Sequence, residues 1–252
     1  TISDLTTSVT NPAVPSTSYI NFLPGTYYIK IEDLESGCIV NDTLNIQSNP
    51  FSTSIISFND VSCYGLNDGA IAVQATGGSN VYNYTLERDM GTSWLQIAQV
   101  LNAPSNIPAT FNSNPPFDYR ILISDTSVCL DTMYFTISEP LPILPNVYGI
   151  SNYNGYNISC FGNSDGQVMA SQTGGIPPYT YSLNGGPYTT NNIFNGLSSG
   201  TSTIFYVDGN NCGPVIETIV LNSPPVLEGL ISVNGSNLAV NASGGLPGYN
   251  YL

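Results

Sequence analysis

The sequence of 252 residues contains no histidine and only three basic residues, Lys30, Arg88 and Arg120. Histidine is the usual general base near neutral pH, so its absence excludes a Ser-His-Asp or Cys-His active site within this chain. The 17 acidic residues give a formal charge of −14. Nucleic acid is not expected as a partner, because phosphate binding needs clustered Lys and Arg. The carboxylates are dispersed and suggest no convergent pair for glycoside hydrolysis. We therefore expect no enzyme and no cofactor.

Long apolar runs are also missing. No stretch of about 18 apolar residues is present, so we expect no membrane insertion by this segment. Charged residues make up 8% of the chain, but apolar residues make up 41%, which is more than a disordered chain normally carries. The abundance of Thr, Ser, Asn, Gly, Pro and Tyr is typical of many short strands joined by tight turns.

The chain does contain an internal repeat. An opening pattern of a loop, an alternating strand, a double glycine and a Tyr-x-Tyr strand occurs three times: "CYGLNDGAIAVQATGGSNVYNYTL" from Cys63, "CFGNSDGQVMASQTGGIPPYTYSL" from Cys160 and "LISVNGSNLAVNASGGLPGYNYL" from Leu230. The Asp-Gly steps of the first two copies predict hairpin turns. With the double glycines aligned, Leu230 takes the place of the cysteine, so we expect the third copy to lack its bridge.

A closing pattern also occurs three times. It consists of an alternating strand, an Asp, a short loop, a Cys and a further strand that ends near a proline; the Asp and Cys pairs are Asp33/Cys38, Asp125/Cys129 and Asp208/Cys212. Four segments follow from this order: 1–50 is the closing half of a repeat, 51–141 a complete repeat with an insertion, 142–225 a complete repeat, and 226–252 the opening half of another. We expect the chain to be a piece of a longer repeat protein.

Period-two alternation without helical stretches predicts antiparallel strands with one buried face. Several short strands in about 90 residues, separated by Gly, Pro and Asn turns, predict an all-β fold of tandem Ig-like β-sandwich modules in an extended array.

The five cysteines fit this repeat. One disulfide per whole module, Cys63 with Cys129 and Cys160 with Cys212, would leave Cys38 to pair outside the chain. Free thiols in a reducing compartment are the alternative. The sequence has no CxxC pair, which argues against redox catalysis.

The combined pattern "CFGNSDG…TGGIPPYTYSLNGG…GLSSG…VDGNNC" resembles the SprB-type repeat of large surface proteins in Bacteroidota. Residues 160–212 match it best. Residues 63–129 depart from it in the middle, where Asn80-Val81-Tyr82 replaces Pro-Pro-Tyr and an insertion carries Trp94. The resemblance implies extracellular modules of very long adhesins, some linked to gliding motility and type IX secretion, with a β-sandwich related to the PKD and Ig types.

Several residues have both an ordinary and a functional interpretation. Asp33, Asp125 and Asp208 are expected to cap the loops that follow them, and calcium between strands or at junctions, near Glu139 and Glu228, is the alternative. The Tyr-x-Tyr pairs are expected in the core, with sugar binding as the alternative. Trp94 is the best single candidate for a partner contact. "DTL" and "DTM" resemble a Bacteroidota O-glycosylation motif, which makes Thr43 and Thr132 candidate glycan sites.

The leading hypothesis is a structural and adhesive rod segment of a long cell-surface protein, located outside the cell. Its expected partners are the neighbouring repeats of the same chain and a surface polymer, glycan or protein receptor. The alternatives are an array of carbohydrate-binding modules in a secreted protein and a subunit of a self-assembling extracellular filament or sheath.

Overall fold

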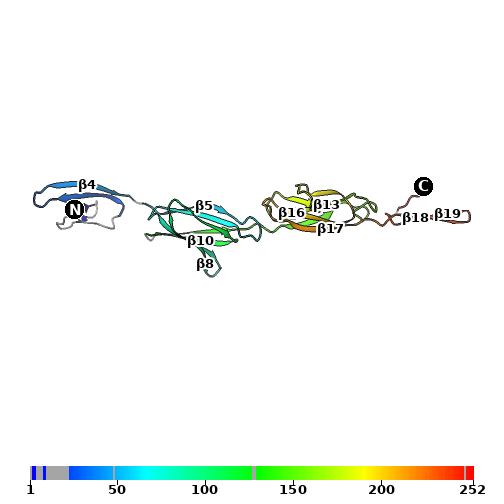
Figure 1. The fold of residues 1–252 in the computed structure, drawn as a ribbon, viewed down its shortest axis with the longest axis horizontal. Coiled ribbons are helices and arrows are strands. Elements are labelled where there is room, and N and C mark those ends of the chain that lie inside the picture. Colours follow the sequence, from blue (N-terminus) through cyan, green and yellow to red (C-terminus); the bar gives the residue numbers. More distant parts are fainter. Residues whose placement is uncertain (1, 4–7, 10–22, 48, 127–128, 247) are drawn as a thin grey trace.

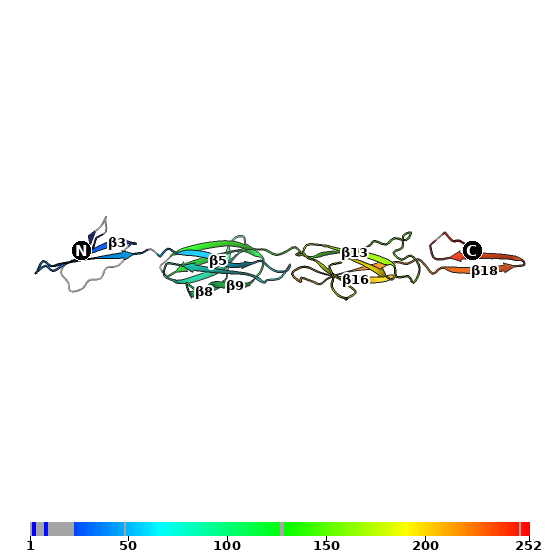
Figure 2. The ribbon, with the colours of Figure 1, turned by 90° about the horizontal axis from the view of Figure 1, so that it is seen from above.

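The computed structural model describes residues 2–3, 8–9, 23–47, 49–126, 129–246 and 248–252. Its strands group into four bodies that follow one another along one axis, so the array is extended (Figures 1 and 2). We call these bodies the first half-module (1–50), the second module (51–141), the third module (142–225) and the last half-module (226–252). The predicted boundaries near residues 50, 141 and 225 lie in the linkers between strands.

The second module is a sandwich of two antiparallel sheets. One sheet has the order β5-β6-β9, with β5 (Ser52–Asn59), β6 (Gly69–Thr76) and β9 (Ala109–Asn114). The other has the order β11-β10-β7-β8, with β7 (Val81–Asp89), β8 (Trp94–Pro104), β10 (Phe117–Asp125) and β11 (Leu130–Ile137). The chain changes sheets after β6, after β8 and after β9, so the closure of the sandwich depends on contacts between residues far apart in sequence.

The core lies between the two sheets and uses the alternating positions that the sequence predicts. Ile71 and Val73 of β6 face Tyr84 of β7 and Ile121 and Ile123 of β10, and each is at most 1% exposed. Burial of a side chain of this size contributes roughly 1.5–3 kcal/mol to folding. The prediction that the Tyr-x-Tyr pairs belong to the core is confirmed for Tyr82, Tyr84 and Tyr181, which are 0%, 0% and 6% exposed.

The third module repeats this plan with shorter strands. Its sheets have the orders β12-β13-β15 and β14-β16-β17. The strands are β12 (Leu144–Gly149), β13 (Gly166–Thr173), β14 (Thr180–Leu183), β15 (Ile193–Leu197), β16 (Gly200–Val207) and β17 (Val215–Leu221). The predicted all-β, β-sandwich class is confirmed, while the Ig or PKD subclass stays a prediction.

The two half-modules each contribute a single sheet. The first has the order β2-β1-β3-β4, with β1 (Ile2–Ser3), β2 (Ser8–Val9), β3 (Gly25–Glu32) and β4 (Ile39–Ile46); residues 1, 4–7, 10–22 and 48 of this predicted segment lie outside the described residues. The last is a hairpin of β18 (Glu228–Asn234) and β19 (Asn237–Ser243). Leu238 and Val240 are 67% and 41% exposed, whereas the matching Val168 and Ala170 are fully buried, because only the whole modules cover this face with a second sheet.

The predicted position of Leu230 is wrong. Leu230 lies in β18 opposite Asn241 and is 67% exposed, rather than in a cysteine-bearing loop. In this hairpin β18 and β19 are joined directly by the turn at residues 235–236. The gapless alignment failed because this hairpin lacks the long loop that separates the corresponding strands of the whole modules.

The described secondary structure consists of strands, bridges, turns and bends. In this described part of the chain, no helix has the length and apolar character needed to cross a bilayer.

Candidate functional site

The loop that carries the first cysteine of each whole module closes on itself through an aspartate. In the opening loop of the second module (residues 60–68), the Leu66 N–H donates to the Cys63 carbonyl at 3.1 Å. The Asp68 carboxylate accepts hydrogen bonds from the Ser62 hydroxyl and, at 2.9 Å, from the Ser62 N–H. These bonds lower the pKa of Asp68 below its usual value. The loop therefore holds Cys63 in a defined position at the end of the module.

The opening loop of the third module has the same construction. The Asn163 N–H donates to the Cys160 carbonyl at 3.1 Å, and the Asp165 carboxylate accepts from the Ser159 hydroxyl and N–H. The predicted Asp-Gly hairpin turn is wrong in detail, because the turn comes earlier, after the cysteine. Gly166 starts β13, where a Cβ atom would lie 2.6 Å from Ile158 Cδ1.

The loop that carries the second cysteine of each repeat is capped by the predicted aspartate. Asp125 Oδ1 accepts from the Cys129 N–H at 2.8 Å, and Asp208 Oδ1 accepts from the Cys212 N–H at 2.9 Å. In the first half-module, Asp33 accepts from the Glu35 N–H at 3.0 Å. The capping interpretation is thus confirmed for all three residues. The described residues contain no cluster of three or more Cys, Asp or Glu suited to a metal ion.

The double glycine clamps each module to the linker that precedes it. The Gly175 N–H donates to the Leu141 carbonyl at 2.8 Å, and Gly78 and Gly245 make the same bond to the linkers before them. Gly174 has a φ of +71°, and a Cβ atom there would lie 1.9 Å from the Pro142 carbonyl oxygen. Only glycine therefore permits this close approach. The Tyr179 hydroxyl completes the clamp by donating to the Gly174 carbonyl at 3.0 Å.

The junction between the second and third modules is covalent. Cys63 in the opening loop of the second module is disulfide-bonded to Cys212 in the closing loop of the third, with a Cα–Cα distance of 5.6 Å. The Asn210 side chain adds a hydrogen bond across the junction to the Ser62 carbonyl at 2.8 Å. The two loops and the linker at residues 140–143 line a half-open cavity of about 410 Å³.

The predicted pairs Cys63–Cys129 and Cys160–Cys212 are therefore wrong. The opening loop precedes β6, while the closing loop meets the double-glycine turn that follows β6, since Asp125 accepts from the Ser79 N–H. The eight residues of β6 separate these ends by roughly 27 Å, whereas a disulfide needs Cα atoms about 4.4–6.8 Å apart. Cysteines of one module thus lie at opposite ends, and end-to-end packing brings together cysteines of successive modules. Cys38, Cys129 and Cys160 are free thiols in this structure.

Residues 55–91 and 153–187 match the family model described as the SprB repeat. Both matches contain the opening cysteine and the double glycine whose roles at the junction are given above. The chain carries SprB-type repeats. This match supports a repeat protein of the cell-surface type found in Bacteroidota.

The other comparisons add little to the SprB-type match. No curated protein matches the chain. Among solved structures, it is similar to "Crystal structure of Salmonella alpha-2-macroglobulin reacted with methylamine" at 8% identity and a TM-score of 0.27, over 84% of this chain and 19% of that one. The chain thus spans about a fifth of that protein's length, and this likeness supports no statement on fold or function.

Trp94 lies at the start of β8, in the SprB-type repeat that carries the insertion. The guanidinium of Arg120 lies 4.4 Å from the Trp94 ring centre, and the Tyr134 ring meets it edge-on at 5.9 Å. Arg120 also forms an ion pair with Glu87 at 2.6 Å. One face of the indole is therefore occupied by a cation, and a groove of about 340 Å³ lies beside the ring, between β8, β10 and β11.

The candidate glycan sites Thr43 and Thr132 lie on exposed positions of the last strand of their repeats, β4 and β11. Thr43 pairs with Tyr28, whereas Thr132 pairs with Leu122. When the two repeats are aligned through Asp33 and Asp125, Thr43 and Thr132 do not occupy equivalent positions, but both lie on the same face of the sheet. Their use as glycan sites stays a prediction.

Sequence reasoning missed the bridge between modules and the contacts of Asn210 and Glu139, whose carboxylate accepts from the Gly65 N–H at 2.7 Å. One available signal was the place of the cysteines. The first cysteine comes before β6, and the second comes after β10. The chain runs along β6, returns along β7, and β10 is antiparallel to β7, so β10 ends at the same end of the module as β6. The two cysteines therefore lie at opposite ends of a module.

Proposed function

We propose that the chain is a structural and adhesive segment of a long extracellular cell-surface protein, in which SprB-type modules form a stiff rod. The observation that carries this proposal is the Cys63–Cys212 bridge, which joins two modules covalently at their junction. The proposal assigns the chain a mechanical role and no catalytic one. Export by the type IX system and participation in gliding belong to the same proposal and rest on the SprB-type repeats alone.

Stiffness follows from three independent restraints on one short linker. The double-glycine turn binds the linker backbone, the disulfide joins the two loops beside it, and Asn210 bonds across the gap. In an array of this kind each module contacts mainly its neighbours, so the properties of the junction set those of the rod. The negative charge of the chain favours solubility and opposes side-by-side association of rods.

Pulling a single molecule by its ends tests the mechanical role. The cysteines are 149 residues apart in sequence, so an intact bridge withholds about 500 Å of extended chain from the applied force. We therefore expect the fully stretched oxidised protein to be shorter than the fully stretched reduced protein by this length. Equal extension of both forms contradicts the mechanical role. The Cys129→Ser variant is the matched control, because Cys129 is a free thiol.

The surface location is tested separately with antibodies against the purified chain. Intact cells of the source organism should bind them, and protease added outside should remove the signal. Labelling only after the cells are opened would contradict an extracellular rod.

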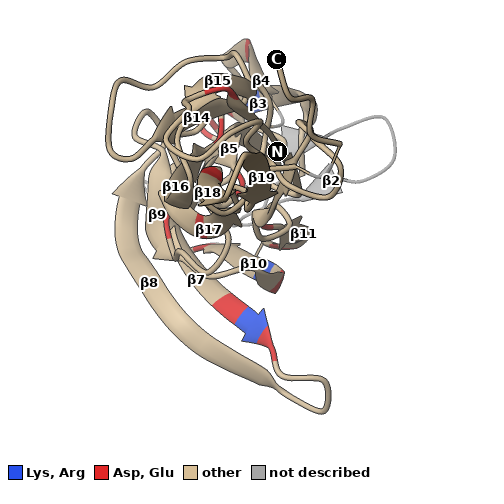
Figure 3. Cartoon of the chain, turned by 90° about the vertical axis from the view of Figure 1, so that its right-hand side faces the viewer, with Lys and Arg blue, Asp and Glu red and all other residues tan. Residues whose placement is uncertain are grey.

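A glycan contact at Trp94 is the second candidate function. The long β7–β8 hairpin projects from the side of the rod (Figure 3), and Tyr134 beside Trp94 is 66% exposed. Trp94 is half-buried, and a partly exposed indole beside an exposed tyrosine ring and a groove suits stacking against a sugar ring. On a glycan array, Trp94→Ala should abolish binding while Leu95→Ala, an exposed neighbour in β8, leaves it unchanged. If the protein binds no glycan on the array, the glycan-binding function is excluded, and the structural role of the rod is unaffected.

A further inference from the structure

We propose that Cys160 forms a disulfide with the closing cysteine of the repeat that begins at residue 226, so that successive junctions each carry one bridge of the Cys63–Cys212 kind. This proposal rests on the geometry of the junctions and not on the adhesive role of the rod.

Cys160 sits in the same local structure as Cys63. Each cysteine carbonyl accepts a bond from the third residue after it, and each preceding serine is held by the aspartate that ends the loop. Each loop is also tied to the end of its own module. The Val61 N–H donates to the Ser138 carbonyl, and the Ile158 N–H donates to the Asn222 carbonyl at 3.2 Å. The two opening loops therefore present their thiols in the same way.

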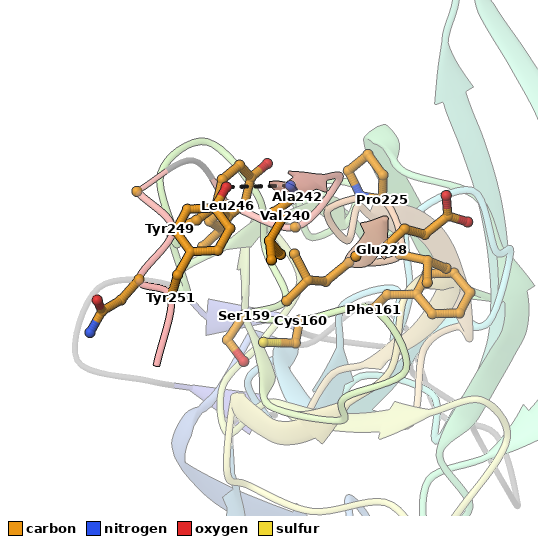
Figure 4. A pocket seen from close by; sticks show the side chains of 16 residues that line it. Ser159, Cys160, Phe161, Pro225, Glu228, Val240, Ala242, Leu246, Tyr249 and Tyr251 are labelled. Carbon is orange, nitrogen blue, oxygen red and sulfur yellow. Dashed lines mark hydrogen bonds between the residues drawn. The ribbon is translucent and has the colours of Figure 1, made fainter. Parts of the chain in front are cut away.

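A groove at Cys160 matches the cavity at the completed junction. Five of its sixteen lining residues are Cys160, Phe161, Pro225, Val226 and Leu227 (Figure 4). Aligned through the contacts of the double glycines with the linkers, these are the counterparts of cavity residues Cys63, Tyr64, Leu141, Pro142 and Ile143.

The cavity at the Cys63–Cys212 junction and the groove at Cys160 differ in the rest of their lining. At the completed junction this part of the lining is the closing loop of the third module, including Asp208, Asn211 and Cys212. At Cys160 the groove is bounded instead by β19 and by Leu246, Tyr249 and Tyr251, and it measures about 860 Å³ against 410 Å³. The groove borders the face of β19 that a second sheet covers in the whole modules, so its larger volume includes the space that the remaining strands and the closing loop fill in those modules.

The groove also offers the polar partners that a closing loop uses. At the completed junction Asp208 accepts from the Ile176 N–H at 2.9 Å, and Asn210 donates to the Ser62 carbonyl. Leu246 and Ser159 are the counterparts of Ile176 and Ser62, and both line the groove. The occupant that fits is therefore an Asp-loop-Cys segment, the closing loop of the repeat that begins at residue 226.

The free thiols agree with a rule in which the opening cysteine of each module bonds to the closing cysteine of the next module. Pairing inside modules would give two bridges in this sequence, whereas pairing between successive modules gives one, and the structure has the single bridge Cys63–Cys212. Cys38 and Cys129 lie in closing loops, so the rule assigns them to the opening loops of preceding modules. Asp125 holds the Cys129 loop with the same bond that Asp208 makes to Cys212.

The chemistry is thiol–disulfide exchange with a small disulfide oxidant such as oxidised glutathione. The Cys160 thiolate attacks one sulfur of the oxidant and releases one glutathione thiolate. The closing cysteine, as its thiolate, then attacks the Cys160 sulfur of the mixed disulfide and releases the second. Two protein thiols are oxidised, one glutathione disulfide is reduced to two thiols, and the two protons pass to the glutathione thiolates.

Two extended chains test the proposal. The first continues residues 1–252 with a second copy of residues 183–225, which completes the last repeat and adds a fourth closing cysteine. The second replaces residues 226–252 with a second copy of the whole third module, residues 142–225. In both extended chains the added counterpart of Val215 is isoleucine, so that the peptide of the added closing cysteine differs in mass from that of Cys212. In each matched control, the added counterpart of Cys212 is serine. After oxidation with glutathione disulfide and alkylation, pepsin digestion is followed by mass spectrometry, because the chain has too few Lys and Arg for trypsin.

We expect a peptide that joins Cys160 to the added closing cysteine, beside the Cys63–Cys212 peptide that serves as internal standard. Cys160 should become fully alkylated in the serine controls. Such a peptide in either extended chain supports the proposal. Alkylated Cys160 in both chains, or Cys160 bonded to Cys38, to Cys129 or to a second molecule, overturns it.

Discussion

At the scale of single residues, the disulfide partner of each cysteine depends on the end of the module at which that cysteine lies. Cys63 and Cys129 belong to one module, yet Cys63 bonds to Cys212 of the next, while Cys129 keeps a free thiol. Residue type and count are equally consistent with either pairing. The end of the module at which each side chain lies decides between them.

The first prediction concerns thiol reactivity. In the oxidised 252-residue chain, Cys38, Cys129 and Cys160 should react with an alkylating reagent without reduction, and Cys63 and Cys212 only after it. Peptide mapping measures this directly. Alkylation of Cys63 and Cys212 without reduction would contradict their bridge, and protection of Cys129 or Cys160 in monomeric protein would contradict their state as free thiols.

The second prediction concerns acid. Hydrogen bonds from the Ser62 hydroxyl and then its N–H lower the pKa of Asp68 below its usual 3.8, and Ser159 lowers that of Asp165 in the same way. A depressed pKa contributes stability that is complete above the unfolded value and is lost as pH falls through the folded value. The free energy of unfolding should therefore be level above about pH 5 and should fall below roughly pH 4.

Urea denaturation at a series of pH values measures this dependence. Asp68→Asn together with Asp165→Asn should reduce the slope below pH 4, while Asp89→Asn, at the end of β7, serves as a control. An unchanged slope in the double variant would show that these loops do not contribute to the acid response.

At the scale of elements, the double-glycine turn does more than end a strand. Sequence reasoning placed it correctly between two strands, but its bonds to the preceding linker depend on a segment that the sandwich brings alongside. Tyr82, Tyr179 and Tyr249 all donate to the carbonyl of the first glycine, which explains why the aromatic strand follows at a constant distance.

The third prediction compares two glycines with positive φ. Gly174→Ala should lower the free energy of unfolding by roughly 3 kcal/mol or more, because its Cβ would meet the Pro142 carbonyl at 1.9 Å in a tightly packed site. Gly185→Ala should cost about 1 kcal/mol, since its φ is +77° but no atom lies within 4 Å of the added Cβ. Equal losses in urea denaturation would contradict the role of close packing.

At the scale of the whole molecule, four bodies in a row share few contacts beyond their junctions (Figures 1 and 2). The bending of the rod is therefore determined where modules meet. Chain-entropy reasoning assigns a bridge over 149 residues roughly 5 kcal/mol at most, with measured bridges more often at 2–4.

The fourth prediction concerns this bending. Cys212→Ser should broaden the distance distribution from small-angle X-ray scattering and shorten its mean, because the freed junction samples bent arrangements. Cys129→Ser should leave the distribution unchanged, as it removes a free thiol. A distribution that is the same for both variants would show that the linker and the double-glycine clamp alone keep the rod straight.

The sequence by itself determined the strands, the repeat, the loop caps at Asp33, Asp125 and Asp208, and the buried faces, because alternation and turn residues act over a few neighbouring positions. Only the tertiary structure decided which cysteines meet, where Leu230 lies and what the double glycines hold. These depend on which ends of the strands lie side by side and on the length of each hairpin. Both are set by the packing of two sheets and of successive modules, which local sequence patterns do not encode.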